Sequence, residues 1–159
     1  MMKKLTPALL SCVLAFTLAK TGNAADGEQF NRHLIGISFG ETDFGSEKEG
    51  TYGLEYEYRI NKLLGIGAGY EESPDAHHED GVSVYLLSGY LHPYKGVRLG
   101  LGFGEEKVHG SHGTTENFTR VSIGYDFHFG NFGIGPTYCL DRVDDETNAV
   151  YGLTFSYGF

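Results

Sequence analysis

The stretch of sequence that decides the fold is Ala149-Val150-Tyr151-Gly152-Leu153-Thr154-Phe155-Ser156-Tyr157-Gly158-Phe159. From Tyr151 onward, large apolar side chains occupy every second position, and Gly, Thr and Ser occupy the positions between them. A period of two places successive side chains on opposite faces of a β-strand. We therefore expect a strand over 149–159 with one bulky apolar face and one face of small or polar residues.

Seven further segments show the same alternation. In chain order they are 33–39, 51–60, 63–70, 82–91, 97–103, 118–129 and 132–140. The connections alternate in length, with tight turns at 61–62, 92–96 and 130–131 and longer, polar, acidic loops at 41–50, 71–81, 105–117 and 141–148. This alternation between an even number of strands is typical of membrane barrels. The sequence predicts an all-β fold, an eight-stranded antiparallel up-and-down transmembrane β-barrel.

The bulky faces are expected to point outward. They carry too many large side chains for the interior of an eight-stranded barrel, which is only just wide enough for side chains. An apolar exterior is stable in lipid, where a closed barrel leaves no backbone group unpaired.

Segment 82–91 has less distinct faces than the others. On its outward face we place Val82, Val84, Leu86, Ser88 and Tyr90. Tyr85 and Leu87 are then expected to point into space that glycines leave on the neighbouring strands.

The composition favours the same fold. The chain has 159 residues, including 24 Gly, 11 Tyr and 11 Phe. Because Gly costs a helix interior about 1 kcal/mol relative to Ala, this glycine content argues against a helical bundle. With 12 Lys and Arg against 21 Asp and Glu, the net charge is -9. A chain this acidic lacks the basic surface that phosphate contacts require, so we expect no nucleic-acid partner.

The start of the chain predicts an export signal. Lys3 and Lys4 precede an apolar run over 5–19, and small residues follow up to Ala24. This order is typical of a secretory signal peptide, and the run is too short for a spanning helix. The expected division is a signal peptide at 1–24 and a single barrel domain at 25–159.

The chain resembles a known family over residues 31–159. The resemblance is based on Tyr58-Arg59-Ile60-Asn61, on the run Leu64-Gly65-Ile66-Gly67-Ala68-Gly69-Tyr70, and on the alternating pattern at the end of the chain. These features resemble the outer-membrane β-barrel domain family, small eight-stranded barrels of Gram-negative bacteria. The resemblance implies location in the cell outer membrane. It also implies a targeting signal at Tyr157 and Phe159 for the assembly machinery, and no common active site.

Charged residues fall on the expected inner face. The candidate interior network consists of Glu55, Glu57, Arg59, Arg98, Arg120, Asp126 and His128. Buried carboxylates need cationic or hydrogen-bonding partners. We therefore expect a polar interior plugged by these side chains, with a role exerted through the loops. A narrow ion or proton pore along the same residues remains the alternative.

An enzyme acting on membrane lipid is the second alternative. Lipid A deacylases of similar architecture use a His and a Ser two residues apart on a lipid-facing strand, and no His-x-Ser occurs here. Asp126 and His128 share a face, but a hydrogen-bonded structural histidine explains them as well. The sequence offers no recognisable catalytic constellation, and we expect no enzymatic activity.

The loops define the expected partners. Candidate metal ligands are His77, His78, His109 and His112, which belong to the two middle loops. Imidazole nitrogens suit Zn²⁺, Ni²⁺ or Cu²⁺, and the acidic loops suit Ca²⁺ or Mg²⁺. We expect no bound cofactor beyond such divalent cations. We expect a monomer surrounded by outer-membrane lipid and lipopolysaccharide, with a host or envelope protein as a further partner for the loops.

Overall fold

A computed structural model describes residues 30–45, 47–76, 81–110 and 113–159. The expected signal peptide lies outside the described residues. Nine strands appear along the described chain: β1 (His33–Asp43), β2 (Lys48–Arg59), β3 (Leu64–Ser73), β4 (Val82–Tyr94), β5 (Val97–Val108), β6 (Thr115–Tyr125), β7 (Phe127–Phe129), β8 (Phe132–Val143) and β9 (Glu146–Gly158). None of the described residues forms a helix long and apolar enough to cross a membrane.

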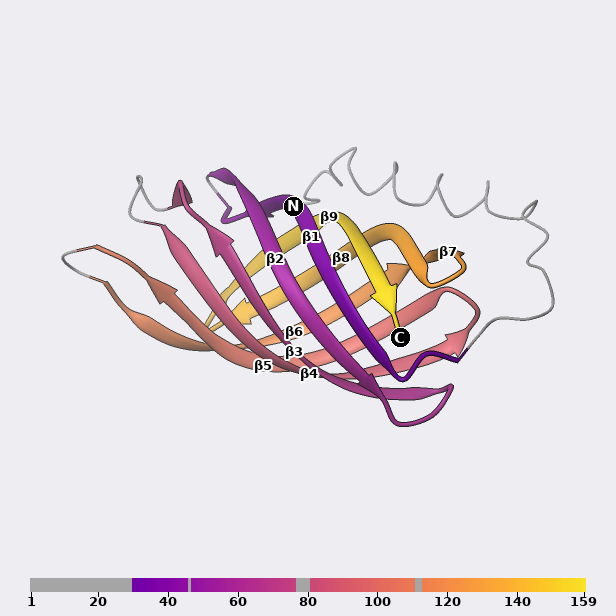
Figure 1. Ribbon diagram of the computed structural model, residues 1–159. Coiled ribbons are helices and arrows are strands. Elements are labelled where there is room, and N and C mark those ends of the chain that lie inside the picture. The colour runs from indigo at the N-terminus through magenta and orange to yellow at the C-terminus, as the bar shows by residue number, and fades with distance from the viewer. Residues whose placement is uncertain (1–29, 46, 77–80, 111–112) are drawn as a thin grey trace, which may run out of the picture.

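The strands close into a barrel (Figure 1). Strands that follow one another in the chain pair in antiparallel fashion, except β6 and β7. β1 also pairs with β9, from Leu34 opposite Gly158 to Asp43 opposite Ala149. β6 and β7 both pair with β8 and make one wall strand, interrupted at Asp126. Pro136 lies on the facing stretch of β8 and has no N–H to donate, which accounts for the break. The wall of the described barrel therefore has eight strands, and the predicted fold class is confirmed.

The two ends of the barrel differ. At the turn end, strands are joined by residues 60–63, 95–96 and 130–131, and Phe159 lies beside His33. At the loop end, connections run over 44–47, 74–81, 109–114 and 144–145. These connections are shorter than predicted, because the ladder continues beyond the apolar band to pairs such as Val143 opposite Glu146.

Side chains alternate across the wall as predicted for most strands. On β9, Leu153, Phe155 and Phe159 are 47%, 43% and 56% exposed, whereas Thr154 and Ser156 are 2% and 8% exposed. The large apolar residues cover the outer surface, and the small or polar residues line the lumen. An outer wall of this composition requires a lipid environment.

The predicted orientation of segment 82–91 is wrong. Val82, Val84, Leu86 and Tyr90 are at most 8% exposed, whereas Tyr85 and Leu87 are 48% and 54% exposed. The inner side chains of β4 fill space beside neighbouring glycines: a Cβ on Gly67 would lie 2.9 Å from Tyr90, and one on Gly102 would lie 2.8 Å from Leu86. The glycines do leave room for β4, but for the opposite set of its side chains.

Candidate functional site

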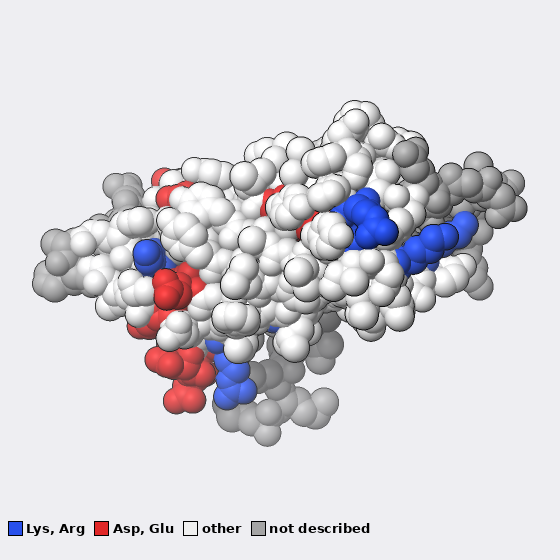
Figure 2. Space-filling view, turned by 60° about the horizontal axis from the view of Figure 1, so that its bottom comes forward, with Lys and Arg blue, Asp and Glu red and all other residues white. Residues whose placement is uncertain are grey.

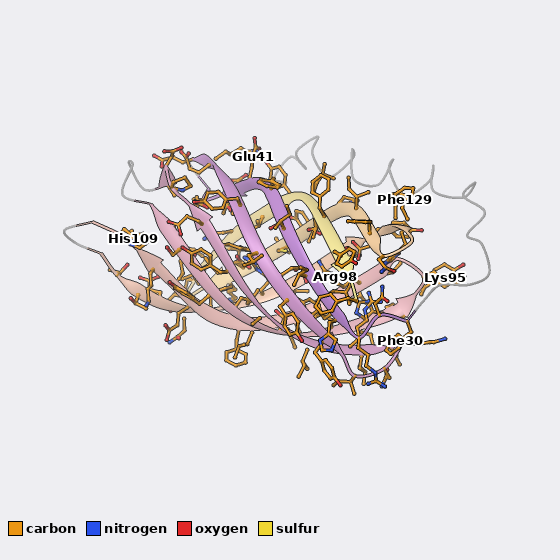
Figure 3. The ribbon with its side chains drawn as sticks, viewed as in Figure 1. Phe30, Glu41, Lys95, Arg98, His109 and Phe129 are labelled. Carbon is orange, nitrogen blue, oxygen red and sulfur yellow. The ribbon has the colours of Figure 1, made fainter. Side chains whose placement is uncertain are left out.

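The buried ion pairs lie in the lumen, in two separate clusters. Figure 3 labels Arg98, which belongs to the cluster nearer the turn end. The loop-end cluster is centred on Arg120 of β6, which is 4% exposed. Its Nε and Nη2 donate to Asp141 Oδ1 and Oδ2, both at 2.6 Å, and Nη2 also donates to Glu71 Oε2 at 2.7 Å. Nη1 donates to the second oxygen of Glu71. One guanidinium thus joins carboxylates from β3 and β8.

The turn-end cluster is centred on Glu57 of β2, which is 1% exposed. His92 Nε2 donates to Glu57 Oε1 at 2.6 Å, Arg59 Nε lies 3.6 Å from the same oxygen, and Arg98 Nη1 lies 3.8 Å from Oε2. Arg98 also donates to Glu55 Oε1 at 2.5 Å. Within the described chain, Glu57 Oε2 and Arg59 Nε have no hydrogen-bond partner.

The predicted network is therefore divided in two. Arg120 pairs with Glu71 and Asp141 rather than with the carboxylates near Arg98. Asp126 is 7% exposed on the turn-end side and acts electrostatically on Arg98. His128 is exposed and lines the turn-end mouth of the lumen.

His92 was missed by the sequence reasoning, which placed it in a turn. β4 continues to Tyr94, and the true turn is 95–96. The alternation of side chains along a strand could have revealed it. Once Tyr90 is placed on the inner face, His92, two residues later, lies on the same face.

Glycines make room for the charged side chains. A Cβ on Gly36 would lie 2.8 Å from Glu55 Cγ, and one on Gly65 would lie 2.9 Å from Glu57 Cδ. Larger residues at these positions would displace the carboxylates from their partners. Glycine on one strand therefore sets the position of a charged side chain on the next.

Small cavities remain along the lumen. One of about 60 Å³ lies between the clusters and is lined by Glu55, Arg98, Glu71 and Arg120, among others. Cavities of about 20 Å³ and 10 Å³ lie toward the turn end and the loop end. Because one water needs roughly 10–15 Å³, the space between the clusters accommodates a few water molecules and the other two accommodate about one each.

An apolar layer lies above the Arg120 cluster at the loop end. Its buried members are Ala76, Val82, Val84, Leu86, Phe118 and Val143, with Phe44 and Val108 packed against them. The sequence reasoning missed this layer because it placed the β4 members outside the barrel.

A polar cluster occupies the outer face near the loop end. Ser83 Oγ lies 2.6 Å from His109 Nε2 and donates to Glu72 Oε2 at 2.9 Å, and the Tyr70 hydroxyl donates to the same carboxylate. The contact resembles a nucleophile–base pair, but Ser83 is only 3% exposed and its proton is directed to Glu72. The arrangement joins β3, β4 and the end of β5 and leaves the hydroxyl inaccessible to a substrate.

The remaining residues that the sequence predicted to be functional lie on the surface or outside the described residues. Tyr157 and Phe159 are exposed on the outer face. The Tyr157 ring is tilted against Phe132, with ring centroids 4.9 Å apart, and the Phe159 ring stacks on His33, with centroids 5.3 Å apart. His77, His78 and His112 lie outside the described residues. In the described part, no group of three or more His, Cys, Asp or Glu side chains is placed to hold a metal ion.

The closed eight-stranded wall, apolar outside and polar inside, is the architecture of small outer-membrane barrels. The chain is similar to the N-terminal β-barrel domain of Pseudomonas aeruginosa OprF, with 16% identity and a TM-score of 0.62, over 82% of this chain and 100% of that one. It is similar to Neisserial surface protein A, with 13% identity and a TM-score of 0.60, over 80% and 96% of the two chains. It is also similar to Ail, the attachment invasion locus protein of Yersinia pestis, with 18% identity and a TM-score of 0.56, over 82% and 100%.

These likenesses confirm the fold expected from the resemblance and agree with an outer-membrane location. No family model matches the chain, and no curated protein matches it.

Proposed function

We propose that the chain is an integral outer-membrane barrel with a closed lumen, and that it acts through its outer wall and its loop end. The observation that supports this proposal is the presence of three successive layers of side chains in the lumen. From the turn end these are the Glu57 cluster, the Arg120 cluster and the apolar layer. Moving an ion through them would require breaking buried ion pairs and wetting an apolar constriction.

Planar-bilayer recording tests the closed lumen. We expect no steady conductance from the folded protein, because the cavities found between the layers in the described part of the barrel are small. Detergent at the same concentration provides the baseline. A steady, ion-selective conductance from the wild-type protein would overturn the proposal and favour the narrow pore.

We further propose that the turn end faces the periplasm and the loop end faces the exterior. The short turns and the chain end near Phe159 support this orientation, since outer-membrane barrels have short periplasmic turns and longer external loops. Protease added to whole cells should cut within 109–114 and spare 95–96. Cleavage at 95–96 in intact cells would invert the orientation.

For the loop end we propose divalent cations that link it to lipopolysaccharide phosphates. Glu41 and Glu105 are exposed on the outer face there, and carboxylates near phosphates repel them unless Ca²⁺ or Mg²⁺ lies between. Binding of lipopolysaccharide to the folded barrel should fall when the cations are chelated. Binding that is insensitive to chelation would exclude such bridges.

A transition-metal site in the middle loops stays a separate proposal. Calorimetric titration with Zn²⁺ at neutral pH should give a heat signal that disappears when His109→Ala is combined with His112→Ala. An unchanged signal in that variant would eliminate these histidines as ligands.

A further inference from the structure

The outer wall is hollowed across β3, β4 and β5. The hollow has a volume of about 460 Å³, and its lining includes Leu64, Ile66, Gly89, Leu91, Leu99 and Leu101. Gly89 forms its floor, because it lies in register between Ile66 on one side and Leu101 on the other. These two side chains are 54% and 68% exposed and form the rims. The wall therefore contains an apolar groove within its lipid-facing surface.

Two lysines lie at the turn end of the same strands. Lys62 belongs to the turn that precedes β3, and Lys95 belongs to the turn between β4 and β5; both are exposed. The backbone N–H of His92 donates to the carbonyl of Leu63 at 2.7 Å, which holds the first turn against β4. Figure 3 shows Lys95 at this end of the barrel, opposite the end that carries His109.

The positive charge of these lysines has no neighbouring carboxylate side chain on the outer surface of the described chain. Near the turn end, the side-chain carboxylates of the described chain are Glu55, Glu57 and Asp126, and all three face the lumen. Figure 2 shows basic side chains at the right-hand end of one face and most acidic side chains toward the left. The groove thus begins beside exposed positive charge and runs into apolar surface.

We infer that the groove and the two lysines form a binding site for an anionic phospholipid. Lys62 and Lys95 would bind the headgroup, and the groove over Gly89 would accommodate an acyl chain. On the orientation proposed above, this lipid belongs to the periplasmic leaflet. The inference goes beyond the closed lumen and does not depend on it.

A lipid fits the site better than a second copy of the chain. A two-fold contact through the groove would bring the same surface of both copies together. Lys62 and Lys95 of each copy would then lie at a shared interface without acidic partners. A phospholipid supplies both the negative charge and the apolar chain, and it surrounds the barrel in any case.

Native mass spectrometry of the folded protein tests the site. The protein, released from detergent micelles that contain equal amounts of phosphatidylglycerol and phosphatidylcholine, should retain phosphatidylglycerol preferentially. The preference should fall on the order of fivefold for each lysine removed, in Lys62→Gln and in Lys62→Gln with Lys95→Gln. Gly89→Leu should lose bound lipid of both kinds, because its side chain fills the groove.

Matched variants separate the site from general effects. Lys48→Gln with Lys107→Gln removes two cations at the loop end, and Ala68→Leu adds an outward side chain outside the groove; both should behave as wild type. Gly89→Leu should fold, since a Cβ there meets no atom nearer than 4.0 Å, and faster gel migration than the boiled sample verifies this.

Three results would overturn the inference. They are equal retention of the two lipids by the wild type, lipid retention by Gly89→Leu equal to that of Ala68→Leu, and a lipid-free dimer that Gly89→Leu abolishes. Each of them leaves the conductance result for the closed lumen unaffected.

Discussion

The two halves of the lumen bury charge in different ways. In the loop-end half, a single guanidinium is enclosed by two carboxylates and uses its nitrogens in four hydrogen bonds. In the turn-end half, Glu57 has His92, Arg59 and Arg98 around it, and one of its oxygens has no hydrogen-bond partner within the described chain. In the loop-end half, one cation neutralises both carboxylates, whereas in the turn-end half several cationic or hydrogen-bonding side chains surround Glu57.

This difference determines how each half responds to the loss of a cation. A buried carboxylate that loses its sole partner bears the full cost of desolvation. A carboxylate that retains another donor bears only part of it. The halves are therefore best compared by removing one arginine from each.

Arg120→Met should have the largest effect. It leaves Glu71 and Asp141 in the lumen without a cation, which should lower the free energy of unfolding by about 3–5 kcal/mol. Urea titration of the barrel in lipid vesicles measures this change. Adding Glu71→Gln and Asp141→Asn to the variant should restore much of the loss. A variant as stable as Lys48→Gln, whose side chain is exposed, would refute the dependence on one residue.

Arg98→Met should have a smaller effect. It leaves one carboxylate, Glu55, without its donor, and the Glu55 side chain is 24% exposed, whereas Glu57 keeps His92 and Arg59. We therefore expect a loss of about 1–3 kcal/mol in the same titration. Adding His92→Leu should then increase the loss, because Glu57 would retain only Arg59. Equal losses for Arg98→Met and Arg120→Met would show that the two halves do not differ.

Val84→Ala should have the smallest effect of the three. Val84 belongs to the apolar layer that covers the Arg120 cluster, and removal of two methyl groups should cost about 1–2 kcal/mol. The variant should remain non-conducting, since both ion clusters persist beneath the layer. Val121→Ala on the outer face provides the control, and a larger loss there would contradict the assignment of Val84 to the interior.

The sequence predicted strands well where one face alone is apolar. β9 and β2 alternate without exception between bulky and small or polar residues through their apolar stretches, so their orientation followed from the pattern. β4 has apolar residues on both faces, Val82 and Leu86 on one and Tyr85 and Leu87 on the other. Periodicity cannot distinguish the two orientations of such a strand, and packing against the glycines of β3 and β5 decides it.

The charged residues were predictable as a set but not as pairs. Parity along each strand placed Arg98, Arg120 and Glu57 inside, and the structure places them there. Arg120 reaches Glu71 across the lumen, from β6 to β3, and strand order alone does not reveal such a contact. It depends on the tilt and stagger of the strands, which follow from closure of the whole barrel.

The pairing of β1 with β9 has a consequence for how the molecule forms. His33 and Phe159 exchange backbone hydrogen bonds of 3.1 Å and 2.9 Å, so the ladder that completes the wall joins opposite ends of the described chain. Contacts at such sequence separation form slowly, because a long segment must be ordered before they are made. Until these contacts form, β1 and β9 each have one edge without a neighbouring strand, and that edge can associate with other chains. Correct folding therefore requires that the free edges of β1 and β9 are kept from pairing with other chains until they pair with each other.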